Sequence, residues 1–108
     1  MPLSLHKAIS DYFAASNAHD ANAVARAFTA DGVVHDEGGT HRGRDAIRAW
    51  ATETIRKYRM TLTPLGVSGG DRSADVNTKV SGTFPGSPIE LTFDFELGDE
   101  GIRSLKIG

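Results

Sequence analysis

Histidine and carboxylate side chains gather around one tight turn of the sequence, and these residue types carry acid–base or metal chemistry. His35, Asp36 and Glu37 precede a Gly-Gly pair, and His41 follows it. Imidazole and carboxylate groups together suit zinc or iron. A stable metal site needs further ligands, and no third histidine or helical histidine pair stands at a suitable spacing. We therefore expect no metal and no cofactor.

The composition excludes several other kinds of chemistry. The sequence has no cysteine, which removes disulfides, thiolate catalysis and sulfur-rich zinc sites. Twelve Lys and Arg residues are scattered among fourteen Asp and Glu residues, so no basic face is evident that would bind a phosphate backbone. Arg42, Arg44 and Arg48 form a modest basic cluster, which is more often a solvated face than an anion site. We expect no nucleic-acid partner.

The length of the chain bounds its organisation. Its 108 residues can bury one stable core but not two, so we expect a single domain over residues 1–108. Residues 1–7 contain no basic stretch followed by an apolar run, and no run of about eighteen apolar residues occurs. Neither secretion nor membrane insertion is expected, and a cytoplasmic location is the default.

Three helices are expected to position the candidate side chains. Apolar residues at three- and four-residue spacing, among them Tyr12 and Phe13, predict a helix over about residues 2–18. Pro2 and Ser4 suit the first turn of this helix.

A second, short helix is capped by Asp20, and its buried stripe runs to Phe28. The third helix begins near residues 43–45, carries Trp50 on its apolar stripe and ends before Met60.

Strands are predicted where the period of the hydrophobic pattern changes from about 3.6 to 2. A short strand over 33–36 precedes the tight turn, and apolar residues alternate with polar ones over 74–80 and 89–97. Residues 102–107 make the last strand. The order is helix, helix, short hairpin, long helix and about four antiparallel strands, which predicts an α+β protein with helices on one face of a curved sheet.

This order of elements, with its residues, resembles the nuclear transport factor 2-like superfamily, and within it the ketosteroid isomerase and SnoaL-like polyketide cyclase branch. The resemblance spans nearly the whole chain and rests on the residue pattern of four segments, namely 11–20 (DYFAASNAHD), 28–32 (FTADG), 43–50 (GRDAIRAW) and 95–102 (FELGDEGI).

The resemblance implies a cone-shaped, cystatin-like roll. In such a fold the sheet wraps a long helix, a mostly apolar pocket lies between them, and two copies pair through the outer face of the sheet. We expect polar rows with Thr78 and Thr92 to face outward, while Phe93 and Phe95 line the interior.

The resemblance also implies site residues. Counting without gaps from Tyr12 places this residue at the family's oxyanion-hole tyrosine and Asp36 at its general base. Counting from Gly43 instead places His35 at the base position. Neighbouring residues of a strand point to opposite faces, so only one of the two faces the cavity, and Asp36 is favoured. The family's protonated aspartic acid falls at Phe93.

With Asp36 as base and Tyr12 as hydrogen-bond donor, such a site moves a proton next to a carbonyl group. The expected ligand is a small apolar or polycyclic carbonyl compound, and the expected activity is that of a cofactor-independent isomerase or cyclase. The residues expected to line the pocket are His35, Trp50, Phe13, Phe28, Phe93 and Phe95.

Each site residue also has a purely structural interpretation. Tyr12 fits a core tyrosine whose hydroxyl reaches a partner, and Asp36 fits an aspartate that binds backbone before a Gly-Gly turn. Trp50 fits a core or cavity wall. Phe93 in place of the family's acid favours a second function, a non-catalytic small-molecule-binding or dimerisation module of the same fold.

Overall fold

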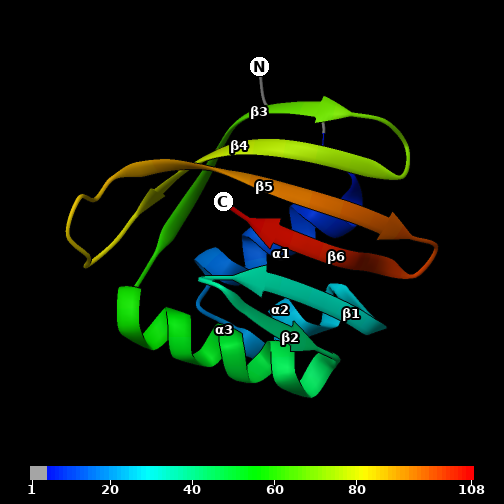
Figure 1. Cartoon of the computed structure of the whole chain (residues 1–108), viewed down its shortest axis with the longest axis horizontal. Coiled ribbons are helices and arrows are strands. Elements are labelled where there is room, and N and C mark those ends of the chain that lie inside the picture. The colour runs from blue at the N-terminus through cyan, green and yellow to red at the C-terminus, as the bar shows by residue number, and fades with distance from the viewer. Residues whose placement is uncertain (1–4) are drawn as a thin grey trace.

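Three helices and six strands make up residues 5–108, the part of the chain that the computed structural model describes (Figure 1). The elements are α1 (Lys7–Asn17), α2 (Ala21–Arg26), β1 (Phe28–Asp36), β2 (Gly39–Arg42), α3 (Arg44–Tyr58), β3 (Thr61–Gly69), β4 (Ser73–Ser81), β5 (Ile89–Gly98) and β6 (Gly101–Ile107). Pro2 and Ser4, expected in the first helical turn, lie outside the described residues. The predicted α+β class is confirmed.

The ends of the helices follow from local hydrogen bonds. The ring Nδ1 of His6 accepts the backbone N–H of Ala8 at 3.1 Å, so α1 begins after His6. The Asp20 carboxylate accepts the N–H of Ala23 at 3.0 Å, as expected of an N-cap. α3 ends where Arg59 takes the left-handed conformation, with φ of 47°.

Phe28 corrects the predicted extent of the second helix. α2 ends at Arg26, and Phe28 opens β1, where it pairs with Ile102 of β6 and is fully buried. The Arg44 guanidinium donates two hydrogen bonds to the Phe28 carbonyl, at 3.1 and 2.9 Å. Phe28 is apolar at the right spacing for the helix, but tertiary pairing with β6 decides its conformation.

The six strands form one sheet in the order β2-β1-β6-β5-β4-β3 (Figure 1). Every neighbouring pair is antiparallel except β1 and β6, which run parallel. β1 begins at Phe28, five residues before the predicted strand over 33–36, and its pairing with β6 shifts register between Phe28 and Val33. A bulged segment has no regular alternation, so the sequence pattern did not reveal it.

The helices cover one face of the curved sheet, with α3 along the β1–β2 end at the bottom of Figure 1. The core lies between the two layers, and its largest fully buried side chains include Phe28, Phe95 and Ile47. Phe93 and Phe95 face this interior and Thr92 faces out, as predicted.

Thr78 corrects the predicted outward row. This side chain is fully buried, because it shares the inner face of β4 with Val76 and Val80. Its hydroxyl donates to the backbone carbonyl of Val76 at 3.1 Å, which supplies the partner that a buried hydroxyl requires.

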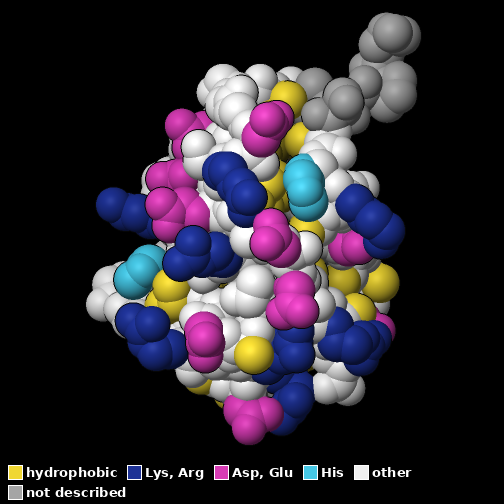
Figure 2. Space-filling view, turned by 90° about the vertical axis from the view of Figure 1, so that its right-hand side faces the viewer, with side chains coloured by type: hydrophobic (Ala, Val, Ile, Leu, Met, Phe, Trp, Pro, Cys, Tyr) yellow, Lys and Arg dark blue, Asp and Glu magenta, His cyan; other side chains and the backbone are white. Residues whose placement is uncertain are grey.

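The surface carries mixed charge. Figure 2 shows Lys and Arg side chains interspersed with Asp and Glu side chains across the face it presents, without a large area of one sign. None of the helices within residues 5–108 combines the length and apolar content that a membrane span requires.

Candidate active site in the cavity between α3 and the sheet

A cavity of about 300 Å³ lies between α3, the inner face of the sheet and the segment 82–88 that joins β4 to β5. Its polar lining consists of Tyr12, Asp36, Glu37, Trp50, Thr54 and Tyr58. Its apolar lining consists of Met60, Val80, Phe84, Pro85, Ile89, Leu91, Phe93 and Ile107. A mostly apolar cavity with a few convergent polar groups is the usual form of a small-molecule site.

Asp36 is the last residue of β1 and its half-buried carboxylate lines the cavity. The indole Nε1–H of Trp50, from α3, donates to Asp36 Oδ2 at 3.1 Å. Burial raises the pKa of the Asp36 carboxyl above its ordinary value, and the Trp50 hydrogen bond opposes part of that effect. The carboxylate is therefore a stronger base than an exposed aspartate, and Trp50 fixes its orientation.

Tyr12 projects from α1 and is only 2% exposed. Its ring centroid lies 5.4 Å from that of Phe13, 6.1 Å from Phe28, 6.3 Å from Phe93 and 5.6 Å from Phe95. Contacts with these four rings hold the tyrosine ring in place, and three of the four are edge to face, as buried aromatic rings prefer.

The Tyr12 hydroxyl faces the cavity. Within residues 5–108 no fully buried polar side-chain atom lacks a partner, and no hydrogen bond joins this hydroxyl to the protein. Burial, and next the charge of Asp36, raise the pKa of the Tyr12 phenol far above its ordinary value. The hydroxyl consequently stays protonated, so its proton is available for a hydrogen bond in the cavity.

His35 lies on the other face of β1 and is exposed. Its ring Nδ1 is 3.3 Å from the Thr40 hydroxyl on β2, and it does not line the cavity. The expectation that His35 lines the pocket is therefore corrected. Alternation along the strand turns Asp36 inward and His35 outward.

The expected aromatic lining separates into two groups. Trp50 and Phe93 line the cavity. Phe13, Phe28 and Phe95 do not line it, and they lie in the core around Tyr12. The expectation for these three is corrected, because they pack in the hydrophobic core, where their rings contact Tyr12.

Of two residues at the cavity mouth, Tyr58 was not singled out from the sequence as a site residue, and Glu37 was considered only as a metal ligand. The Tyr58 hydroxyl, near the end of α3, donates to Glu37 Oε1 at 2.6 Å and joins the helix to the β1–β2 turn. Trp50, Thr54 and Tyr58 follow one another at four-residue spacing, which is the signal that places Tyr58 on the cavity side of α3.

The described residues contain no group of three or more His, Asp or Glu side chains that could hold a metal ion. His41 packs beside the Trp50 ring, with centroids 6.1 Å apart, and does not line the cavity. The histidines at the tight turn thus lie outside the site.

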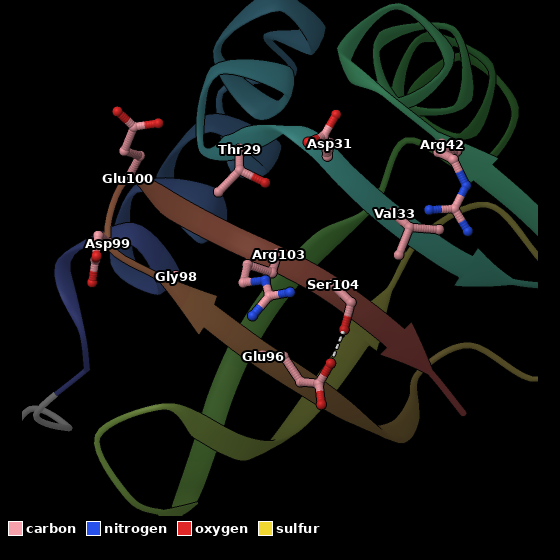
Figure 3. A pocket seen from close by; sticks show the side chains of 10 residues that line it. All are labelled: Thr29, Asp31, Val33, Arg42, Glu96, Gly98, Asp99, Glu100, Arg103 and Ser104. Carbon is pink, nitrogen blue, oxygen red and sulfur yellow. Dashed lines mark hydrogen bonds between the residues drawn. The ribbon is translucent and has the colours of Figure 1, made fainter.

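A second depression, of about 610 Å³, lies on the outer face of the sheet beside the irregular pairing of β1 and β6 (Figure 3). Arg42 and Arg103 lie along it together with several carboxylates, and the Ser104 hydroxyl donates to Glu96 Oε2 at 3.0 Å. It is open and charged, and neither Tyr12 nor Asp36 reaches it.

Comparison with known proteins agrees with this fold. The sequence profile of the SnoaL-like domain matches residues 9–101. A proposed polyketide cyclase from Sinorhizobium meliloti is similar, with 36% identity, a TM-score of 0.92, and coverage of 96% of this chain and 95% of that chain. No curated protein matches the sequence.

Two more distant structures share the fold alone. One is a hypothetical protein with a ketosteroid isomerase-like fold from Catenulispora acidiphila, in complex with trimethylamine (20% identity, TM-score 0.85, 97% of this chain and 86% of that chain). The other is SalBIII, an epoxide hydrolase/cyclase-like enzyme in pyran ring formation in the polyether salinomycin (23% identity, TM-score 0.80, 94% of this chain and 86% of that chain). Because the profile spans residues 9–101 and the first relative is 36% identical over nearly its full length, this chain belongs to the SnoaL-like domain family.

Proposed function

We propose that this SnoaL-like protein binds a small carbonyl compound in the cavity and moves a proton on it, with Asp36 as the base and Tyr12 as the donor to the carbonyl oxygen. One observation carries the proposal: a half-buried carboxylate and a phenolic hydroxyl without a protein partner line the same mostly apolar cavity. Proton abstraction next to a carbonyl requires that pair of groups.

In the proposed reaction, Asp36 removes a proton from the substrate and later returns it to the substrate. Asp36 takes the proton from the carbon next to the carbonyl, and the electron pair of that C–H bond moves to the carbonyl oxygen. The Tyr12 O–H hydrogen-bonds to that oxygen and stabilises the enolate. Asp36 then returns the proton to another carbon of the conjugated system, or to the same carbon.

The electrostatics of the cavity suit this transfer. A carboxylate whose pKa is raised by burial is a better match for proton abstraction near neutral pH. The negative charge moves from Asp36 to the substrate oxygen, so the cavity holds no additional charge during the reaction. Trp50 keeps the carboxylate oriented throughout.

The site offers one donor to the substrate oxygen within the described residues. Phe93 occupies the wall where a second acid would stand, and the Trp50 N–H is engaged by Asp36. Removal of one such donor typically costs about 10²–10³ in turnover. We therefore expect a slower reaction than at a site with two donors.

The volume of the cavity favours a small substrate over a polycyclic one. Ligand cavities span about 300–1,000 Å³, and this one, at about 300 Å³, lies at the lower limit. Of the two distant structures named above, the first is in complex with trimethylamine and the second is an enzyme in pyran ring formation. Both support a small-molecule role for this cavity too.

The test uses cyclohex-3-enone, a compact β,γ-unsaturated ketone, and follows its conversion to the conjugated isomer by ultraviolet absorbance. Asp36→Asn should lower the rate by about 10²–10⁴, the usual contribution of a general base. Asp71→Asn is the matched control, because Asp71 is exposed on the β3–β4 turn. Equal rates for the wild-type protein and Asp36→Asn would reject Asp36 as the base.

Phe93 favours a second candidate function, binding without turnover. A phenyl ring beside the substrate oxygen would supply apolar contact and no stabilisation of an enolate. Native mass spectrometry of freshly purified protein separates the two candidates: a retained small molecule together with no enone conversion supports binding alone.

We also propose that two copies pair through the outer face of the sheet. On this face β5 presents Glu90, Asp94 and Glu96, and the neighbouring strand β6 presents Arg103 and Lys106. Adjacent rows of opposite charge suit an isologous contact, in which the same surface meets itself across a two-fold axis. Light scattering coupled to size exclusion should give twice the chain mass of 11.5 kDa.

A further inference from the structure

We infer that the cavity binds small organic cations of the alkylammonium class more tightly than neutral molecules of the same shape. This goes beyond the proposed proton transfer, because it assigns to the cavity a ligand class that the reaction does not need. The inference stands on the combination of aromatic rings, carboxylates and missing basic side chains in the cavity lining.

Aromatic rings make up five of the fourteen described residues that line the cavity. Tyr12, Trp50, Tyr58, Phe84 and Phe93 all line the cavity, and they come from α1, α3, the segment 82–88 and β5. Each ring carries negative potential on its face, so a cation is attracted to it, and enclosure by several rings is the arrangement that recognises alkylammonium groups.

Two of these lining rings contact each other edge to face. The Tyr58 and Phe84 centroids lie 5.9 Å apart with an interplanar angle of 89°. The Tyr58 ring already makes one cation–π contact, with Lys57 Nζ at 5.0 Å from the ring centroid. This ammonium is on an exposed side chain that does not line the cavity.

The charges of the lining have one sign. Asp36 and Glu37 are both lining residues, and no Lys, Arg or His is among the described residues that line the cavity. Two basic residues contact rings of the lining without lining the cavity themselves: Lys57 Nζ lies 5.0 Å from the Tyr58 ring centroid, and the His41 ring lies 6.1 Å from that of Trp50. An anion would therefore meet repulsion from two carboxylates, and a cation would meet attraction.

Asp36 is a half-buried carboxylate whose direct side-chain partner is the Trp50 N–H, a neutral donor. Within residues 5–108 the ion pairs closer than 4 Å do not include Asp36 or Glu37. Burial disfavours the charged carboxylate, as its raised pKa indicates, and a cationic ligand would offset that cost. An alkyl-substituted ammonium suits the apolar walls better than a metal ion or bare ammonium does.

The test compares choline with 3,3-dimethylbutan-1-ol, in which a neutral carbon replaces the positive nitrogen. Both probes have the same shape, and choline stays charged at every pH. Isothermal titration calorimetry at about 0.15 M salt should show choline binding about thirtyfold more tightly, which corresponds to about 2 kcal/mol.

Two variants identify the groups responsible. Asp36→Asn should weaken choline binding at least tenfold and leave the neutral alcohol within about twofold, because only the charge is removed. Asp71→Asn, which removes the same charge from the β3–β4 turn, should change neither probe. Phe84→Leu keeps an apolar wall but loses a ring face, and should weaken choline about three- to fivefold.

The outcomes are distinct from those of the proposed function. Equal affinity for the two probes, or equal loss of choline binding in Asp36→Asn and Asp71→Asn, overturns the cation preference even if the enone is converted. Choline binding with the expected pattern supports the preference even if no enone is converted. A circular dichroism melt of each variant confirms that it is folded, and Phe84→Leu decides the matter should Asp36→Asn not fold.

Discussion

Replacement of Tyr12 by Phe removes one oxygen and leaves the ring in place. The ring keeps its four aromatic neighbours at centroid distances of 5.4 to 6.3 Å. No hydrogen bond to the protein is lost, because none joins the Tyr12 hydroxyl to residues 5–108. A lost hydrogen bond costs about 0.5–1.5 kcal/mol, so the free energy of unfolding should change by less than about 0.5 kcal/mol.

The same change should nearly abolish proton transfer. If the hydroxyl is the donor to the substrate oxygen, Tyr12→Phe should slow cyclohex-3-enone conversion by about 10²–10³. Tyr12→Ala is the contrasting variant, because loss of the whole buried ring should cost about 3–5 kcal/mol of stability. The two variants thus separate the hydroxyl from the ring.

Urea denaturation with equal m-values measures the stability of each variant, and ultraviolet absorbance measures the rate. A Tyr12→Phe variant that loses more than about 1 kcal/mol would show that the hydroxyl is bonded within the folded protein. That result would favour the core-tyrosine interpretation. An unchanged rate would refute the donor assignment directly.

Two further changes test the fold and the site. Because burial raises the pKa of Asp36 in the folded protein, stability should fall as pH rises from the ordinary value of 3.8 through the raised pKa. Asp36→Asn should remove that fall and increase the melting temperature at pH 7, which thermal melts across pH measure. Asn17→Ala should lower the free energy of unfolding by about 1–3 kcal/mol in urea, because its side chain bonds both the N–H and the carbonyl of Leu62, at 2.7 and 2.9 Å.

The periodicity of the sequence was sufficient for most elements of the fold. Helical spacing around Tyr12 and Trp50 predicts α1 and α3, because a face that packs on a sheet must be apolar every three or four residues. Strict alternation over 89–97 predicts β5 and the direction of Phe93. These patterns are local, so they can be read without knowing the partner surface.

The conformation of Phe28 and the burial of Thr78 were predicted wrongly from the sequence. Phe28 fits the helical stripe of α2, but β6 recruits it into the sheet. Thr78 is polar, but its neighbours on the inner face of β4 are buried, and so is Thr78. Long-range pairing outweighs the preference of the residue at Phe28, and the alternation along β4 outweighs it at Thr78.

The sequence by itself determined that Asp36 and His35 point to opposite faces, that no thiol chemistry is available, and that an aspartate and a tyrosine stand at the family's site positions. Only the tertiary structure decided that Asp36 faces the cavity, bonded to Trp50, and that Tyr12 presents its hydroxyl there. Only the tertiary structure revealed Glu37 and Tyr58 at the mouth and the aromatic, acidic character of the wall. The physical reason is that a cavity is the space left between elements that are far apart in sequence, so no local pattern encodes its shape or its charge.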